Sequence, residues 1–226
     1  MSTYVYMRVL ESAPHRYDVG IRLLSLGRID ELYRDAAEAA VAGAAAPKVL
    51  EIGCGTGNLT QALADRGALV TAIDWNPDML EQARKKLASV GAQVEIKEMA
   101  AVEIADRFPA GGFDAVASTL TFSEMGAEEQ RYVLEAAGKV LRDGGRLVIG
   151  DEVRPRRWWQ RCWHALVRWP LAVLTYVVTQ TTTKAVADLA ELVGSAGFRV
   201  LAERRSAHGS LAVVVAEKSV TAPKGA

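Results

Sequence analysis

The sequence predicts a doubly wound α/β domain with a mostly parallel, seven-stranded sheet. Three observations lead to this fold. Short buried strands alternate with helices of about 10–15 residues, the pattern of a parallel sheet covered on both faces. A glycine-rich loop connects the first strand, residues 48–52, to the next helix. The last two strands, 198–205 and 211–218, are separated by a short turn without a helix, so we expect an antiparallel hairpin at or near the sheet edge.

Residues that favour the first or last positions of helices and strands predict the individual elements. Residues 28–42 repeat apolar side chains at helical spacing and predict a helix. Asn58 is expected to cap the helix that ends at Gly67, while Asn76 followed by Pro77 begins the next one. The strands are short runs of buried β-forming residues. The expected strands are 48–52, 69–74, 92–97, 113–119, 146–152, 198–205 and 211–218, and the expected helices are 28–42, 59–66, 76–91, 128–141 and 185–197.

The composition limits the class of protein. With 226 residues, half of them hydrophobic, the chain has enough material for one domain with an elaboration, and global disorder is excluded. Its 27 basic and 27 acidic side chains give zero net charge, which argues against a nucleic-acid-binding protein. Two cysteines are too few for a disulfide framework or a cysteine-based zinc site, and no metal site is expected. The N-terminus has no apolar signal region, so we expect a cytoplasmic protein.

A basic, tryptophan-rich insert interrupts the α/β pattern. Four of the five tryptophans fall between Trp158 and Trp169. Five arginines and Lys184, without any acid between Val153 and Ala187, give this stretch a charge of +6 against −6 for the remainder. We expect N-terminal cap helices in 1–45, the main domain in 46–152 and 185–218, the insert in 153–184, and a flexible tail in 219–226.

The loop from Gly53 to Gly57 has glycine at every second position. Glycines allow a tight turn and a close approach of the backbone to a ligand. The loop is not the dinucleotide-binding fingerprint, because Asn58 stands where that motif needs glycine, and it lacks the lysine of a phosphate-binding Walker loop. Asp74 ends the second strand, 21 residues after Gly53, where a carboxylate can accept hydrogen bonds from both ribose hydroxyls. Glu51 adds a second negative charge suited to a cationic ligand, unless both acids are merely polar strand ends.

Four segments within residues 46–152 resemble class I S-adenosylmethionine-dependent methyltransferases of the UbiE/menaquinone-methyltransferase type. They are VLEIGCGTGNLT, VTAIDWNPDMLEQARKK, FDAVAST and KVLRDGGRLVIGDE. The resemblance implies a Rossmann-like fold. It also implies S-adenosyl-L-methionine as the cofactor and S-adenosyl-L-homocysteine as its product.

The resemblance assigns residues to this cofactor. The three loop glycines would lie beneath it, Glu51 would face its ammonium group directly or through water, and Asp74 would hold its ribose. Trp75 corresponds to the apolar position over the adenine, with ordinary packing as the alternative. Tyr17 matches a capping region, or it fastens an N-terminal helix. The cofactor-binding residues predicted in this way are Tyr17, Glu51, Gly53, Gly55, Gly57, Asp74, Trp75, Met79, Ala100, Ala101 and Ser118.

One position departs from the family pattern. Many relatives carry an aspartate after the third strand that accepts a hydrogen bond from the adenine amino group, and here the equivalent residue is Ala100. Backbone groups around Ala100 and Ala101 remain to pair with the ring edge. Glu98 and Glu103 are nearby acids that either substitute or are solvated.

Candidate catalytic and acceptor-binding residues follow the fourth and fifth strands or lie in the insert. Methyl transfer from a sulfonium is an in-line displacement, so a base is needed only where the acceptor loses a proton. Glu124 is a candidate base or a solvated acid, and His164 is a candidate proton acceptor or a packed residue. The acceptor-binding candidates are Ser123, Asp151, Trp159, Trp163 and Thr182.

The insert admits several interpretations. Its apolar part contains Arg168 and Pro170 and is shorter than the roughly 20 residues of a membrane span, so no transmembrane helix is expected. Residues 156–179 would form a lid over the acceptor, a peripheral membrane contact, or a docking surface for a protein carrying the acceptor. Extra core packing or a dimer contact is the simpler alternative.

A narrower resemblance spans nearly the whole chain. Five segments together look like corrinoid-protein-associated methyltransferases, which implies a corrinoid protein as a candidate partner. They are ESAPHRYDVGIRLLSLGRIDELY, EMAAVEI, STLTFSEM, GDEVRP and RWPLAVLTYVVTQTTTKAVADL. We expect an enzyme that methylates a small-molecule or carrier-bound acceptor in an apolar pocket. The alternatives are a quinone or lipid methyltransferase at the membrane surface and a non-catalytic, cofactor-binding partner of a corrinoid protein.

Overall fold

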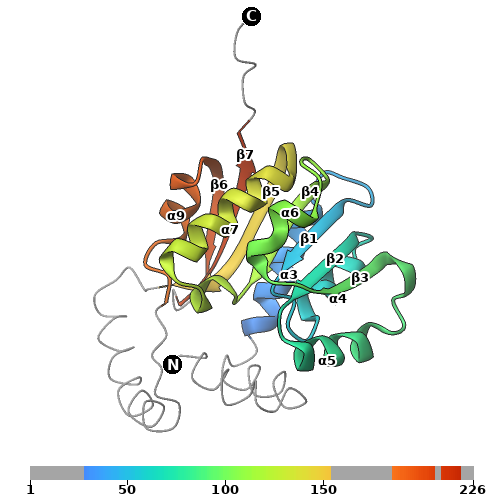
Figure 1. Cartoon of the computed structure of the whole chain (residues 1–226). Helices are drawn as coiled ribbons and strands as arrows, with labels where there is room; N and C mark the ends of the chain where they lie inside the picture. Colours follow the sequence, from blue (N-terminus) through green and yellow to red (C-terminus); the bar gives the residue numbers. More distant parts are fainter. Residues whose placement is uncertain (1–27, 154–184, 207–209, 220–226) are drawn as a thin grey trace, which may run out of the picture.

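The computed structural model describes residues 28–153, 185–206 and 210–219 (Figure 1). The strands are β1 Lys48–Ile52, β2 Leu69–Asp74, β3 Val94–Glu98, β4 Phe113–Thr119, β5 Leu141–Glu152, β6 Phe198–Arg205 and β7 Leu211–Lys218. The helices are α3 Arg28–Val41, α4 Asn58–Ala64, α5 Pro77–Leu87, α6 Ile104–Arg107, α7 Ala127–Val140 and α9 Leu189–Ser195. Short 3-10 turns are η1 Gly91–Gln93, η2 Ala101–Glu103 and η3 Phe122–Glu124.

The strands form one seven-stranded sheet in the order β3-β2-β1-β4-β5-β7-β6. Strands β1 to β5 pair in parallel, whereas β7 lies antiparallel between β5 and β6. The predicted α/β, Rossmann-like fold with a C-terminal antiparallel hairpin is therefore confirmed. Because the parallel strands share one direction, their carboxyl ends meet along the same edge of the sheet.

Two hydrophobic cores hold the helices on opposite faces of this sheet (Figure 1). One core joins α3, α4 and α5 to the sheet through buried side chains such as Leu32, Leu63 and Leu80. The other joins α6, α7 and α9 through Ile104, Leu134 and Leu189. Each helix contributes the apolar side of an amphipathic pattern, and the central strands β1, β4 and β7 are mostly buried, whereas the edge strands β3 and β6 are more exposed.

Two of the predicted helix starts are wrong. Asn58 does not cap α4: Gly57 takes the capping position in a left-handed conformation, and the Asn58 side chain binds Thr56 and Lys86 instead. The last helix begins at Leu189 rather than 185, because Asp188 caps it. Val186, upstream of that cap, bridges to Val153.

The structure describes only part of the predicted outer segments. Residues 1–27, the insert from 154 to 184 and the tail from 220 to 226 lie outside the described residues. In the three described ranges, no helix is long and apolar enough to cross a membrane. A search of the same ranges finds no group of three or more His, Cys, Asp or Glu side chains arranged to hold a metal ion.

Candidate functional site

A cavity of about 400 Å³ lies at the carboxyl ends of β1, β2 and β4. Ligands of open α/β sheets bind at this edge, where the loops that follow the strands converge. The wall consists of the glycine loop after β1, the segments after β2, β3 and β4, and side chains from the helices α3, α4, α5 and α7. The lining residues are Tyr33, 52–56, 58–59, 73–76, Met79, 99–101, 119–121, 124–125 and Glu129.

The glycine loop is shaped by three residues with positive φ, Gly53, Gly55 and Gly57. A Cβ atom on Gly53 would lie 2.2 Å from the Thr121 hydroxyl oxygen, so the close approach of the two loops requires glycine there. A Cβ atom on Gly57 would lie 2.9 Å from Leu87 Cδ1 on α5. Gly53 and Gly55 line the cavity, whereas Gly57 packs against α5 outside its wall.

Asp74 links the end of β2 to the glycine loop. Its Oδ2 accepts a hydrogen bond from the Gly55 amide at 2.8 Å, and its Oδ1 accepts one from the Asn76 amide at 2.9 Å. Burial raises the pKa of Asp74, and these backbone hydrogen bonds oppose the rise. The carboxylate lines the cavity with its orientation fixed, so its remaining lone pairs are available to a hydroxyl-bearing ligand.

Glu51 lies beneath the loop rather than in the cavity wall. It is buried, and the Thr60 hydroxyl donates a hydrogen bond to its Oε2 at 2.6 Å. Burial raises the pKa of Glu51 to about 8, although the Thr60 bond lowers it. Burial also raises the pKa of Cys54 far above its ordinary value, which disfavours the thiolate form at this position.

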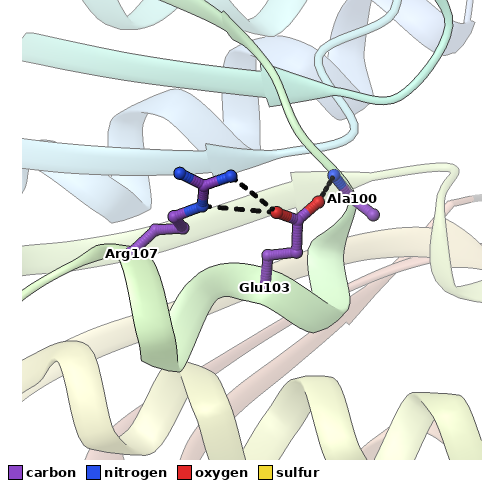
Figure 2. Close-up of polar contacts among 3 residues, drawn as sticks. All are labelled: Ala100, Glu103 and Arg107. Carbon is purple, nitrogen blue, oxygen red and sulfur yellow. Dashed lines mark hydrogen bonds and ion pairs between the residues drawn. The ribbon is translucent and has the colours of Figure 1, made fainter.

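The segments after β2 and β3 form the opposite side of the cavity. Trp75 is 70% exposed although it lines the cavity, and Met79 contributes an apolar side chain beside it. Ala100 and Ala101 follow β3 and also line the cavity. Figure 2 shows that the Ala100 amide donates to the carboxylate of Glu103. A flat apolar ligand fits between these side chains better than a charged one.

The loop after β4 brings further groups to the cavity. Leu120 has a φ of 58°, which turns the chain sharply toward η3. The Thr121 hydroxyl lies within hydrogen-bond distance of three backbone carbonyls, those of Ile52, Gly53 and Thr119. Glu124, the candidate base, follows in η3 and lines the cavity.

Three predicted site residues, Ser118, Ser123 and Asp151, do not line the cavity. They form hydrogen bonds that hold the loop after β4 in place. The Ser118 hydroxyl donates to the Ile52 carbonyl at 2.8 Å. Asp151 is fully buried, and it accepts hydrogen bonds from the Ser123 and Glu152 amides at 3.1 and 2.6 Å. Burial raises the pKa of Asp151 to about 6, against the effect of these donors. Asp151 therefore connects β5 to η3, the turn that carries Glu124.

Several lining residues were not singled out from the sequence. Tyr33 counted only as part of the apolar face of α3, and Glu129 is an ordinary acidic residue in the first turn of α7. Thr121 and Met125 belong to the segment after β4 but form no motif of their own. Their place in the wall depends on the turn at Leu120, for which the sequence carries no glycine signal.

Five predicted site residues lie outside the described residues. They are Tyr17, Trp159, Trp163, His164 and Thr182. Their roles in cofactor capping, acceptor binding and proton transfer remain predictions.

Comparison with known proteins agrees with the fold. Residues 49–145 match a family model described as a methyltransferase domain. The demethylmenaquinone methyltransferase of Clavibacter sepedonicus is 39% identical over 139 residues, which cover 62% of this chain and 54% of that protein. The enzyme of the same name from Thermus thermophilus is 39% identical over 142 residues, covering 62% of this chain and 61% of that protein. The matched region thus spans little more than half the length of these relatives.

The fold extends beyond this matched region. A crystal structure of the 1,6-didemethyltoxoflavin-N1-methyltransferase of Burkholderia thailandensis, with bound 1,6-didemethyltoxoflavin and S-adenosylhomocysteine, has a TM-score of 0.67 at 19% identity. The similarity covers 97% of this chain and 92% of that one, and it shows a shared fold. Residues 49–145 are therefore similar to methyltransferase domains, and these matches, together with the glycine loop and Asp74, support S-adenosylmethionine as the cofactor.

Proposed function

We propose that the protein transfers a methyl group from S-adenosylmethionine to a small-molecule or carrier-bound acceptor in the cavity at the carboxyl edge of the sheet. The observation that carries the proposal is the Asp74 carboxylate, held by the Gly55 and Asn76 amides in the wall of a cavity of about 400 Å³. A ribose diol placed on this carboxylate lies next to the Gly53–Gly55 backbone, where a side chain on Gly53 would collide with Thr121.

The residues present fit this donor. S-adenosylmethionine supplies a methyl group on a sulfonium; the acceptor atom forms a new bond to that carbon as the sulfur–methyl bond breaks, leaving neutral S-adenosylhomocysteine. Asp74 binds the ribose, and Trp75, Met79 and Ala100 offer apolar surface to the adenine. Alignment in a site screened from water supplies most of the rate enhancement for such a displacement.

The acceptor side of the cavity lies next to the loop after β4. Thr121 and Met125 combine a hydroxyl and an apolar side chain, and Glu124 adds a carboxylate that can take a proton from an acidic acceptor. We infer that Glu124 is the base where the acceptor is a carbon or oxygen acid. A soft acceptor such as a thiolate or a corrinoid metal centre needs no base.

Quinone methylation is the second candidate function. It is favoured by the two demethylmenaquinone methyltransferases that are 39% identical to this chain over about three fifths of its length. A quinone precursor dissolved in a membrane would need a peripheral contact, for which the basic, tryptophan-rich insert has suitable composition.

Transfer of a labelled methyl group tests both functions. Full-length protein is incubated with methyl-labelled S-adenosylmethionine and an acceptor panel of demethylated quinones in liposomes, soluble phenols and amines, and a methyl-accepting corrinoid protein. We expect label in an acceptor, lost in Asp74→Ala and retained in Glu81→Gln, an exposed carboxylate on α5. Cofactor binding without transfer to any class would instead support a non-catalytic role. Full activity on soluble acceptors without liposome association would exclude the membrane function.

A further inference from the structure

A lysine in the last turn of α5 is bound to the second half of the glycine loop. Lys86 Nζ donates to Asn58 Oδ1 at 2.8 Å and to Thr56 Oγ1 at 3.4 Å. Asn58 Nδ2 in turn donates to Thr56 Oγ1 at 3.2 Å. Thr56 and Asn58 line the cavity, whereas Lys86 is half-buried outside its wall. The three side chains therefore connect α5 to the wall of the cavity.

Contacts with α5 fix the position of this part of the loop. An ammonium group has donors and no acceptor, so it faces the carbonyl oxygen of the Asn58 amide. The NH₂ group of Asn58 consequently points to the Thr56 hydroxyl. Between these two residues, a Cβ atom on Gly57 would lie 2.9 Å from Cδ1 of Leu87, the residue after Lys86. Both the side chains and the backbone of the loop thus pack against the end of α5.

The charges in the cavity wall give this connection a role in ligand binding. In the described part of the chain, the charged residues that line the cavity are the acids Asp74, Glu124 and Glu129. S-adenosylmethionine carries a carboxylate in its amino-acid part, which these acids would repel. With the ribose on Asp74 and the adenine against Trp75, the amino-acid part would extend along the glycine loop toward Thr56. Lys86 places a positive charge behind this end of the wall, which offsets the repulsion.

We propose that Lys86 is a positioning residue which, through Asn58 and Thr56, makes this end of the cavity wall select the carboxylate of the cofactor. Asn58 and Thr56 lie in the wall and Lys86 does not, so Lys86 acts through them and does not touch the ligand. The inference rests on the proposed function, because the carboxylate is that of S-adenosylmethionine. It assigns a role to a residue on α5 that neither the glycine loop nor Asp74 indicates.

Three ligands separate this role from a general contribution to the fold. S-adenosylhomocysteine carries both the ammonium group and the carboxylate of the amino-acid part. Its decarboxylated analogue keeps the ammonium group and lacks the carboxylate. Methylthioadenosine keeps the adenine and the ribose and lacks the whole amino-acid part. A residue that selects the carboxylate therefore changes the affinity for the first ligand and leaves the affinities for the other two nearly unchanged.

Calorimetric titration of full-length protein with these ligands tests the proposal. The native chain should bind S-adenosylhomocysteine about 10-fold more tightly than the decarboxylated analogue. In Lys86→Met the affinity for S-adenosylhomocysteine should fall about 10-fold, while the affinities for the other two ligands change less than about threefold. Lys86→Arg keeps a cation with several donors and should retain most of the preference. Lys85→Met is the matched control, because this neighbouring lysine is exposed and pairs with Glu81, and it should match the native chain.

A double-mutant cycle tests the route through Asn58. Asn58→Ala should lower the affinity for S-adenosylhomocysteine and spare methylthioadenosine. Because Lys86 acts through Asn58, the variant Lys86→Met/Asn58→Ala should lose less binding free energy than the two single variants lose together. Additive losses would show that the two residues act independently, which would contradict this route.

Other outcomes would overturn the proposal. If Lys86→Met weakens all three ligands equally, Lys86 supports the glycine loop and does not select the carboxylate. If the native chain binds S-adenosylhomocysteine and Lys86→Met binds it equally well, this inference fails while the proposed cofactor stands. If the native chain binds none of the ligands, the cofactor assignment fails and this inference fails with it. Should Lys86→Met not fold, Asn58→Ala carries the test, and an unchanged preference for the carboxylate in that variant overturns the proposal.

Discussion

Gly53 and Gly55 differ in what surrounds them, although both have a left-handed backbone. At Gly53 a Cβ atom would lie within 3 Å of three Thr121 side-chain atoms, while at Gly55 nothing lies within 4 Å. A left-handed conformation alone costs an L-residue about 1–2 kcal/mol. Gly53 therefore carries a steric requirement that Gly55 does not share.

The Gly53→Ala variant should lose cofactor binding. Its methyl group forces Thr121 away from the loop, which moves both walls of the cavity. We expect affinity for S-adenosylhomocysteine to fall by more than 10-fold, measured by calorimetry. In Gly53→Ala/Thr121→Gly the collision is removed and part of the affinity should return. If the double variant binds no better than the single one, the contact with Thr121 is not the reason for glycine at position 53.

Glu51 makes the stability of the ligand-free protein depend on pH. Its pKa rises from 4.5 to about 8 because the carboxyl is buried. The folded chain thus holds this proton more tightly than the unfolded chain, so the free energy of unfolding falls as the pH rises from about 4.5 to about 8. The slope for one proton cannot exceed about 1.4 kcal/mol per pH unit.

The Glu51→Gln variant should remove this decline. Glutamine keeps an acceptor for the Thr60 hydroxyl and cannot ionise. Urea unfolding between pH 6.5 and 8 is the suitable measurement, since Asp151, with a pKa of about 6, is already largely ionised there. Native protein should lose stability over this range and Glu51→Gln should not. An equal decline in both proteins would show that another group titrates.

The connection between β4 and α7 is stabilised by side chains from β5 and from α7 itself. Asp151 on β5 accepts from the Ser123 amide, and Gln130 on α7 donates to the Phe122 carbonyl oxygen at 2.6 Å. These bonds fix η3, which places Glu124 in the cavity wall. Asp151 acts on the cavity through η3, because it does not line the cavity itself.

Replacing Asp151 by asparagine should disturb η3 more than the cofactor side of the cavity. One amide of Ser123 or Glu152 would then face an NH₂ group, which costs about 1–3 kcal/mol. We expect kcat to fall about 10-fold while the Kd for S-adenosylhomocysteine changes less than threefold. Asp143→Asn, an exposed acid on the same strand, is the control. If the affinity for S-adenosylhomocysteine fell as much as kcat, Asp151 would not act on the η3 side of the cavity alone, which would contradict this prediction.

The elements differed in how well the sequence predicted them. Strands such as β1, β2 and β4 have the expected bounds because they are short, mostly apolar runs that end at polar residues or glycine. The start of α4 was misjudged because Gly57 and Asn58 both suit a cap, and contact with Leu87 and Lys86 decides between them. Local signals cannot report such tertiary contacts.

For the whole molecule, too, local sequence patterns predicted the sheet, whereas tertiary contacts decide which side chains line the cavity. Strand alternation predicted the layers and the edge of the sheet that carries the cavity, and the motif of glycines and Asp74 predicted groups that line this cavity. Ser118 and Asp151 lie one residue before the ends of β4 and β5, yet their side chains form hydrogen bonds with neighbouring backbone groups and do not line the cavity. Tyr33 and Glu129 enter the cavity from helices whose patterns indicate only packing or solvation.

Calorimetric titration with S-adenosylhomocysteine tests the central claim most directly. The two cores hold the ends of β1, β2 and β4 in one rigid edge, so the native chain should bind one ligand per chain without further assembly. Asp74→Ala removes the acceptor of the ribose hydroxyls and should weaken binding at least 10-fold, whereas Glu81→Gln should leave it unchanged. Absence of binding by the native chain, or equal binding by Asp74→Ala, would contradict the account.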